Sequence, residues 1–249
     1  RNMSAIGIEL RNESLGSSNM PDTSRLAVYL NALHRLNYRR LSVCAGLRCI
    51  ISPPSASASI RTAEHPYGRT KIGLYPYANA SLRIADCWKV GAAWRRSARM
   101  PSFTELYYKK DGHSADPHLK PEEMETIEVT AAYSSAYGTL HTALYRKHGT
   151  DMLDWILDTR PPADVQESLW TSVNHAVINS YGAELQGKLL LERQLHGITL
   201  GNHMLQLKSL TLGYSYIYQR QKKEEYIQSL YALEYLRHKV ACSITLGLM

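Results

Sequence analysis

The side chains best suited to bind a small molecule gather in one stretch of the chain. Residues 107 to 118 hold tyrosines, aspartates and histidines, namely Tyr107, Tyr108, Asp111, His113, Asp116 and His118. A second stretch adds Asp151, Asp154, Trp155 and Asp158. Aromatic rings offer flat apolar contact, and polar groups orient a ligand. We therefore expect ligand contacts in both stretches, although each residue taken singly also fits an ordinary solvated loop.

Two other kinds of chemistry are less favoured. His113 and His118 could hold a metal ion with Asp111 or Asp116, but acids and histidines are common in solvated loops, so we expect no metal site and no cofactor. Catalysis is disfavoured because the sequence has no G-x-S-x-G, no H-E-x-x-H, no glycine-rich phosphate loop and no Cys–His signature. We therefore expect a protein that is not an enzyme.

Composition narrows the class of protein. With 44% hydrophobic and 20% charged residues among 249, the chain lies in the ordinary folded range. No run approaches the roughly 18 apolar residues that a membrane-spanning helix needs, and no signal peptide is recognisable. The net charge of +7 comes from scattered Lys and Arg. We expect no nucleic-acid partner, whereas a surface lying among lipopolysaccharide phosphates fits this excess.

Apolar and polar residues alternate along most of the chain, which is the period of a β-strand with one dry and one wet face. From Trp88 to Arg95 the even-numbered residues are Trp, Val, Ala and Trp, and the odd-numbered ones are Lys, Gly, Ala and Arg. Trp88 and Trp94 stand about 20 Å apart, close to the spacing of the aromatic girdles of a membrane barrel. The same period predicts strands over 25–36, 38–51, 73–85, 87–97, 122–136, 138–149, 171–191, 209–221 and 230–249.

Charged residues deep inside these strands suit a hydrated lumen better than the solvent face of a compact sandwich. They are Arg83, Lys89, Arg95, Glu128, Glu184 and Lys188. Tight turns at Asn37–Tyr38, Asp86 and Ala136–Gly138 alternate with long connections, as in barrels with short turns at one end and long loops at the other. The long connections are 52–72, 98–121 and 150–170. We therefore predict an all-β fold, part of a large antiparallel transmembrane β-barrel covering residues 1–249 as one partial domain; only the connection 192–208 departs from the pattern.

Two short segments resemble a known family. Residues 99–108 read R-M-P-S-F-T-E-L-Y-Y, and residues 119–122 read L-K-P-E. The pair resembles TonB-dependent outer-membrane receptors, in which R-x-P-S-F-x-E-L-Y ends one strand and L-K-P-E opens the next. Residues 180–185, S-Y-G-A-E-L, resemble the G-x-E-L strand of that family. The fit is closest to receptors of Bacteroidetes type, including cobalamin-receptor-like ones.

Most of this motif has a structural interpretation. Pro101 has no N–H to continue a ladder, and Pro121 returns the chain to extended geometry. Phe103, with Leu106, Tyr107 and Tyr108, can pack the base of the loop against the barrel rim. The residues interpreted as structural are Arg99, Pro101, Phe103, Glu105, Leu119, Lys120, Pro121 and Glu122.

The resemblance implies about nine to ten strands of a barrel of about 22. The plug domain, the TonB-contacting box and the terminal aromatic residue of the family are not found here, as expected of a barrel region truncated at both ends. The resemblance also implies an outer-membrane location, contact with lipid and lipopolysaccharide, TonB contact through the missing N-terminal region, and import of a scarce nutrient chelate: cobalamin, siderophore-iron or haem. The alternative is an unplugged porin- or adhesin-type barrel.

Overall fold

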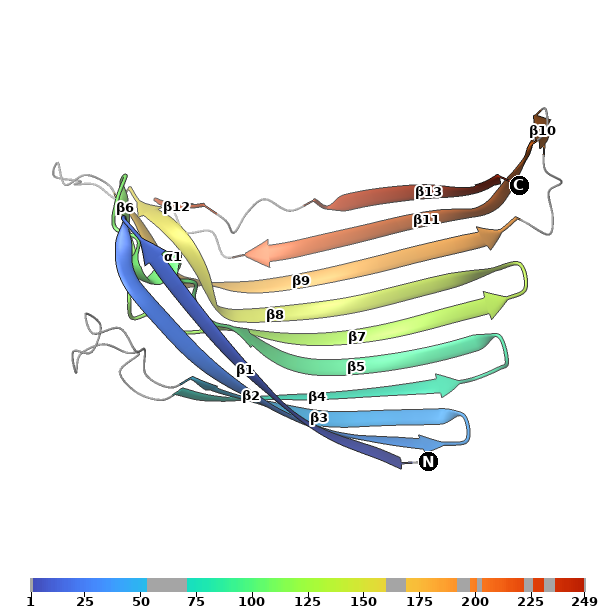
Figure 1. Ribbon diagram of the computed structural model, residues 1–249, viewed down its shortest axis with the longest axis horizontal. Helices are drawn as coiled ribbons and strands as arrows, with labels where there is room; N and C mark the ends of the chain where they lie inside the picture. The colour runs from blue at the N-terminus through green and yellow to red at the C-terminus, as the bar shows by residue number, and fades with distance from the viewer. Residues whose placement is uncertain are drawn as a thin grey trace.

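Ten long strands make up most of the computed structural model, which describes residues 2–52, 71–159, 169–191, 198–200, 203–221, 226–230 and 236–248 (Figure 1). The long strands are β1 (Asn2–Ser17), β2 (Met20–Tyr38), β3 (Leu41–Ser52), β4 (Lys71–Arg83), β5 (Trp88–Arg99), β7 (Glu122–Ser135), β8 (Gly138–Asp158), β9 (Trp170–Leu190), β11 (His203–Gln221) and β13 (His238–Leu248). The short elements are α1 (Phe103–Tyr107), β6 (His113–Ser114), β10 (Ile198–Leu200) and β12 (Ile227–Ser229).

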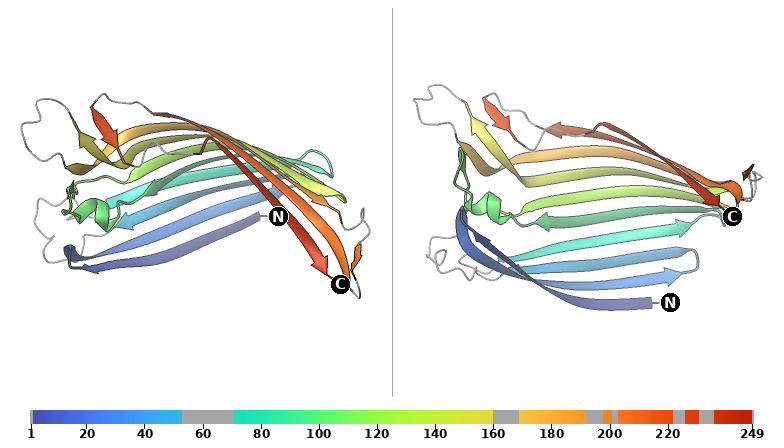
Figure 2. Two further views of the ribbon diagram at one scale, coloured as in Figure 1. Left: turned by 90° about the horizontal axis from the view of Figure 1, so that it is seen from above. Right: turned by 45° about the horizontal axis from the view of Figure 1, so that its top comes forward.

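The long strands form one antiparallel sheet in the order β1-β2-β3-β4-β5-β7-β8-β9-β11-β13. The sheet curves into an open trough, and both chain ends lie at the same end of it (Figures 1 and 2). This turn end carries the turns at Arg39–Arg40, 84–87 and Ala136–Tyr137. The opposite, loop end carries α1, β6 and β12. The all-β antiparallel prediction is therefore confirmed.

The strand register aligns the apolar residues of neighbouring strands on one face of the sheet. At the level of Trp94 in β5, one row of paired residues continues through Ile127, Arg146, Tyr181 and Tyr218 in β7, β8, β9 and β11. The side chains of a paired row share one face of a sheet. Tyr181 and Tyr218 are thus neighbours on the outer face, with Trp94 in the same row three strands away. Aromatic residues near the ends of the strands on this face are typical of the girdle of a membrane barrel.

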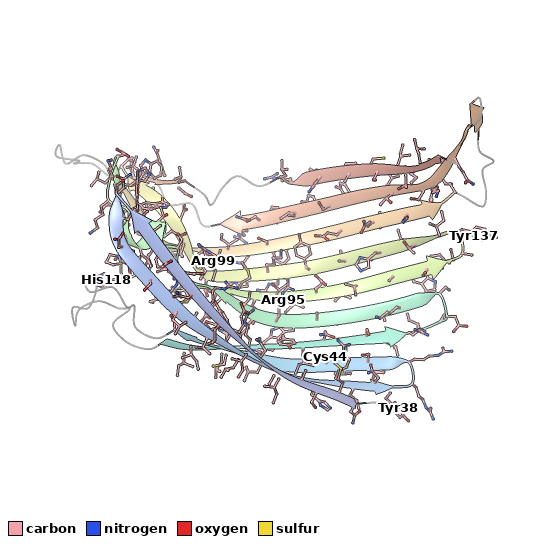
Figure 3. All side chains as sticks on the ribbon, in the orientation of Figure 1. Tyr38, Cys44, Arg95, Arg99, His118 and Tyr137 are labelled. Atoms are coloured by element: carbon pink, nitrogen blue, oxygen red, sulfur yellow. The ribbon has the colours of Figure 1, made fainter. Side chains whose placement is uncertain are left out.

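A second aromatic level lies towards the turn end of the same face. Trp88 is paired with Tyr133, and their ring centroids are 5.0 Å apart. Tyr38 and Tyr137 also lie at the turn end (Figure 3). Between the two levels the face is apolar and exposed, with Leu82, Val129, Leu144, Leu185, Leu212 and Val240 each 41% exposed or more. An exposed apolar patch of this extent is typical of contact with lipid.

The polar residues occupy the opposite face. Lys89 and Glu128 line one hollow there, together with Thr130. Glu184 lines a second hollow with Lys239. The expected separation into an apolar outer face and a charged inner face is thus present in the register of the strands.

Several predicted boundaries were wrong. β1 was not expected, although its even-numbered residues Ile6, Ile8 and Leu10 alternate with polar ones. The turn expected at Asn37–Tyr38 lies at Arg39–Arg40. The tight turn at Ser18–Asn19 joins β1 to β2 at the loop end, against the predicted asymmetry.

The connection predicted at 150–170 was also too long. β8 continues to Asp158, so Asp154 and Trp155 lie in a strand rather than in a loop. β11 begins at His203 instead of residue 209, and β13 begins at His238 instead of residue 230. The expected connection at 52–72, most of 160–170 and parts of 192–208 lie outside the described residues. No helix among the residues that the structure describes is long and apolar enough to cross a membrane.

Candidate ligand-binding site

An ion-pair cluster forms the base of the segment between β5 and β7. Arg99, the last residue of β5, donates two hydrogen bonds to the Glu105 carboxylate, at 3.1 and 2.9 Å, and one from Nε to Glu122 at 2.6 Å. Glu122 also accepts a hydrogen bond from the backbone N–H of Leu153 at 2.8 Å. Bidentate arginine–carboxylate pairs fix geometry as well as charge. The cluster thereby joins β5, α1, β7 and β8 at one point (Figure 3 labels Arg99).

Helix α1 begins in this cluster and has a complete capping box. The Ser102 hydroxyl accepts a hydrogen bond from the Glu105 N–H, and Glu105 accepts one from the Ser102 N–H. The two residues thus satisfy each other's free donors at the helix start. Sequence reasoning missed this helix, although the S-x-x-E spacing was present, because five residues are too few to show a helical period.

Apolar side chains pack beneath the cluster. Leu106, Tyr107, Leu119 and Leu153 form a buried core at the loop end, against which Met100 and Phe103 pack. Leu106 and Leu119 are 2% and 1% exposed. The expected packing of Phe103, Leu106 and Tyr107 is present, whereas Tyr108 turns to other partners.

Arg25 of β2 ties this core to the far side of the trough. Its guanidinium donates to the Pro101 carbonyl oxygen at 2.7 Å and lies 5.1 Å from the centre of the Phe103 ring. Pro101 is almost fully buried. The base of the segment is therefore held from β2 as well as from β5.

Two side chains of β9 fasten the remainder of the segment. The Ser172 hydroxyl donates to the Glu105 carbonyl oxygen and accepts from the Asp116 N–H, each at 2.7 Å. The Asn174 amide accepts from the Lys120 N–H at 2.7 Å and donates to the Lys120 carbonyl oxygen at 3.0 Å. Sequence reasoning named neither as a site residue. They hold the segment 100–121 against the inner side of β9.

Tyr108, Asp111 and His113, which were predicted to contact ligand, form a small group with a fourth such residue, Trp155. The Tyr108 hydroxyl donates to Asp111 at 3.0 Å, and the Tyr108 ring lies 5.8 Å from that of His113. His113 in turn meets Trp155 edge to face at 5.2 Å. The hydrogen bond to Asp111 raises the pKa of Tyr108. The group presents aromatic and polar edges at the loop end.

The remaining residues predicted to contact ligand differ in how far their side chains are exposed. Asp116 and His118 pair with each other at 3.1 Å, and His118 is exposed at the loop end (Figure 3). Tyr107, Asp154 and Trp155 are buried, at 9%, 3% and 3% exposed. Burial raises the pKa of the Tyr107 phenol. Among the described residues, no three His, Cys, Asp or Glu side chains gather as a metal ion would require.

One large hollow on the inner face was not anticipated. It has a volume of about 1070 Å³ and is bounded by inner-face residues of β1 to β5 and by the start of the segment 100–121. Six arginines line it, together with four aromatic residues: Arg11, Arg25, Arg48, Arg95, Arg96, Arg99, Tyr29, Tyr75, Tyr77 and Phe103. The register of β1, which sequence reasoning overlooked, was needed to assemble it.

The wall of this hollow opens between β4 and β5. Their ladder ends at Tyr77 opposite Arg95, and the next residue of β4 is Pro76, which has no N–H to donate. Tyr75 packs into the opening with Ile50 and Ala98. Because β4 and β5 are not paired here, both odd- and even-numbered residues of β5, including Arg96, line the hollow.

The electrostatics of the loop base favour the charged forms of Arg99 and Glu105. Hydrogen bonds to Glu122 and Glu105 raise the pKa of Arg99. Burial alone would raise the pKa of Glu105, but hydrogen bonds from Arg99 and Ser102 outweigh it and hold that pKa below its ordinary value. Arg99 and Glu105 therefore stay ionised at neutral pH.

Comparison with known proteins agrees with this geometry. A search of curated proteins finds no match. The iron transporter FrpB from Neisseria meningitidis (F3-3 variant) shares the fold with a TM-score of 0.60 and 13% identity, over 88% of this chain and 33% of that one. The copper transporter OprC does so with a TM-score of 0.55 and 13% identity, over 88% and 36%.

The chain thus spans about a third of the length of these transporters. Their barrels show the architecture to which the curved ten-stranded sheet corresponds. The family model described as TonB dependent receptor-like, beta-barrel, matches residues 4–234. TonB-dependent receptors are transporters of the outer membrane rather than enzymes. The chain belongs to the TonB-dependent receptor-like β-barrel family.

Proposed function

We propose that residues 1–249 form part of the barrel wall and the extracellular vestibule of a receptor that captures a scarce nutrient chelate and imports it with TonB energy. The observation that carries this proposal is the hollow of about 1070 Å³ on the inner face, placed directly below the ordered base of the segment 100–121. Pockets lined by aromatic rings and a few polar groups suit compact ligands. The names of the similar structures, iron and copper transporters, support a metal chelate.

The ligand-binding residues we propose lie at the loop end. Tyr108, Asp111 and His113 provide one edge, and Asp116 and His118 provide a second. The buried Tyr107, Asp154 and Trp155 lie beneath these residues, and the His113 ring of the first edge contacts Trp155. Cobalamin, siderophore-iron and haem are the candidate ligands. The closer relationship to receptors of Bacteroidetes type, including cobalamin-receptor-like ones, stays a prediction from the sequence motif.

The outer face supports contact with lipopolysaccharide. Arg146 lies in the row of Tyr181 and Tyr218, and Arg220 lies two rows nearer the loop end, opposite Asn179. Cations just beyond an aromatic girdle stand at the height of headgroup phosphates. We expect replacing Arg146 and Arg220 by Gln to lower the thermal stability of the full-length receptor in lipopolysaccharide-containing bilayers and to leave it unchanged in neutral phospholipid.

Growth of a deletion strain tests the transport proposal. Cells lacking the full-length gene are grown on limiting cobalamin, ferric siderophore or haem, with and without a plasmid copy of the gene, and in a background lacking TonB. We expect one nutrient to require both the gene and TonB. Growth restored without TonB would instead favour the unplugged porin- or adhesin-type barrel, and no requirement for any chelate would refute the proposal.

A further inference from the structure

The arginines of the inner hollow fall into two groups. Three of them are neutralised within the wall. Arg25 pairs with Glu13 through Nε at 3.1 Å and a second nitrogen, Arg96 pairs with Glu123 at 2.8 Å, and Arg99 pairs with two carboxylates as described above. The charges of these three arginines are therefore balanced by carboxylates of the protein itself.

The second group has too few carboxylates. Arg11 and Arg48 share Glu9, at 3.0 and 3.5 Å. Arg95 has no ion-pair partner among the residues that the structure describes. Glu9 is the only carboxylate that the described chain pairs with any of these three guanidinium groups, and Glu13, which also acts on Arg11, is already paired with Arg25. This part of the inner wall therefore carries excess positive charge. Such charge in a concave site attracts anions.

The two arginines that share Glu9 also flank one aromatic ring. The guanidinium carbons of Arg11 and Arg48 lie 5.2 and 4.5 Å from the centre of the Tyr29 ring. Stacking on an aromatic face orders a guanidinium while leaving its N–H groups to donate in its plane. The Nε of Arg48 is buried and has no hydrogen-bond partner. A buried donor without a partner is destabilising. An oxygen-rich ligand can reach the terminal N–H groups of Arg48, because the side chain as a whole is 40% exposed.

Arg95 approaches the same space from the other side. It lies opposite Tyr77, whose ring lies over Gly46 of β3; a Cβ at Gly46 would lie 2.4 Å from the ring. Gly46 is two residues from Arg48 on the same face of β3. Because β3 and β5 are two strands apart, roughly 10 Å separates their backbones. A ligand of about that width can therefore contact both sides at once.

We propose that the inner wall of β1 to β5 is a binding subsite for an anionic metal chelate, contacted by Arg11, Arg48 and Arg95 over a floor formed by Tyr29 and Tyr77. The proposal rests on the function proposed above and names its substrate class. It predicts a negatively charged, oxygen-rich chelate rather than a neutral one. An acidic segment of the plug domain could also occupy this wall, and the experiment below distinguishes it from an anionic chelate.

The test uses the purified full-length receptor with two probes, a trianionic ferric tris-catecholate and a neutral ferric trihydroxamate. Binding is measured for the wild type, the triple variant Arg11→Gln, Arg48→Gln, Arg95→Gln, and the control Arg83→Gln, which changes an inner-face arginine near the turn end. We expect the triple variant to bind the anionic probe at least about 100-fold more weakly, from the loss of charge-assisted hydrogen bonds. The control should bind as the wild type does.

Equal binding of the anionic probe by the triple variant and the wild type overturns the proposal. So does a preference of the wild type for the neutral probe. A triple variant that melts earlier in the absence of chelate but binds the anionic probe normally assigns the arginines to the plug and also overturns it. If the triple variant does not fold, Arg95→Gln alone decides, because Arg95 gives up no ion pair within the described chain.

The outcome is separable from that of the proposed function. TonB-dependent import of a neutral chelate, with no effect of the arginine variants, refutes the charge preference and leaves the transport proposal standing. Absence of import in cells refutes the transport proposal itself, whatever the purified protein binds.

Discussion

Arg99 and Glu105 are joined by two parallel hydrogen bonds of 3.1 and 2.9 Å, which fix helix α1 to the end of β5. The third bond of the same guanidinium, to Glu122, reaches the start of β7. One side chain therefore closes both ends of the segment 100–121. The residues above it can present a preformed surface, because their base is fixed before any ligand arrives.

Replacing Arg99 by Lys tests this closure. Lysine keeps the charge but lacks the planar fork that contacts two carboxylates. We expect a loss of about 1–2 kcal/mol, discounted because the Arg99 side chain is 49% exposed, and faster proteolysis between residues 108 and 118 of the full-length receptor. The control is Arg96→Lys, whose pair with Glu123 is exposed on both sides, for which we expect at most about 0.5 kcal/mol. Equal proteolysis of the two variants would contradict the interpretation.

The same cluster predicts a pH dependence. The pKa of Glu105 is lower in the folded protein than its ordinary value of about 4.3. Its contribution to stability is therefore complete above that value and is lost as the pH falls through the lower folded pKa. We expect the protection factors of the α1 amides, which correct for the intrinsic pH dependence of exchange, to fall below about pH 4 in the wild type. Glu105→Gln should show low protection factors already at neutral pH, with little further change on acidification; wild-type protection factors that stay constant down to pH 3 would refute this.

The apolar core at the loop end should respond to truncation as a protein interior does. Leu119 is 1% exposed, so Leu119→Ala should cost about 2–5 kcal/mol and loosen the segment 100–121. Leu144 is 62% exposed on the outer apolar face and is the matched control. In a bilayer, Leu144→Ala leaves no cavity, because lipid fills the space. Urea unfolding of the full-length receptor from lipid vesicles measures both variants, and similar losses would argue against a packed core.

The alternation of residues was sufficient to predict the sheet where the ladders are regular. From Leu41 to Ser135 the predicted strands match the observed ones within a few residues, because each residue shift would move an apolar set to the wrong face. The prediction failed where the ladder is irregular. In β8 the pairing with β9 shifts between Gly149 and Met152, and Asp151 has a positive φ of 52°. The period of two is broken there, so the continuation to Asp158 was interpreted as a loop.

The candidate site was only partly predictable, for a different reason. The segment 107–118 could be singled out by its residue types alone. The arginine-lined hollow could not, since Arg11 and Arg95 are distant in sequence and meet only through the pairing of five strands. Which of its six arginines pair with carboxylates and which do not is decided by the register of the strands and not by the sequence pattern.

A buried hydroxyl gives a sharp test of how the segment 100–121 is fastened. Ser172 is 1% exposed and bonds both to the Glu105 carbonyl oxygen and to the Asp116 N–H. Ser172→Ala leaves two buried backbone groups unsatisfied, so we expect a loss of about 1–3 kcal/mol. Ser172→Thr keeps the hydroxyl and serves as the control for polarity. Thermal unfolding of the full-length receptor measures the change, and an alanine variant as stable as the wild type would show that water replaces both bonds.

Gly138 tests the turn end, where β8 leaves the Ala136–Tyr137 turn and pairs with β9. A Cβ at this position would lie 2.2 Å from the carbonyl oxygen of Lys188, a backbone atom that the ladder holds in place. Gly138→Ala must therefore shift one strand against the other, at a cost of about 1–3 kcal/mol. At Gly187 a Cβ would meet only a Leu140 methyl group at 3.8 Å, so Gly187→Ala should be neutral or slightly stabilising. Unfolding of both variants in lipid vesicles distinguishes the two explanations. A close backbone approach destabilises Gly138→Ala alone, whereas a general cost of removing glycine from a strand would destabilise both variants equally.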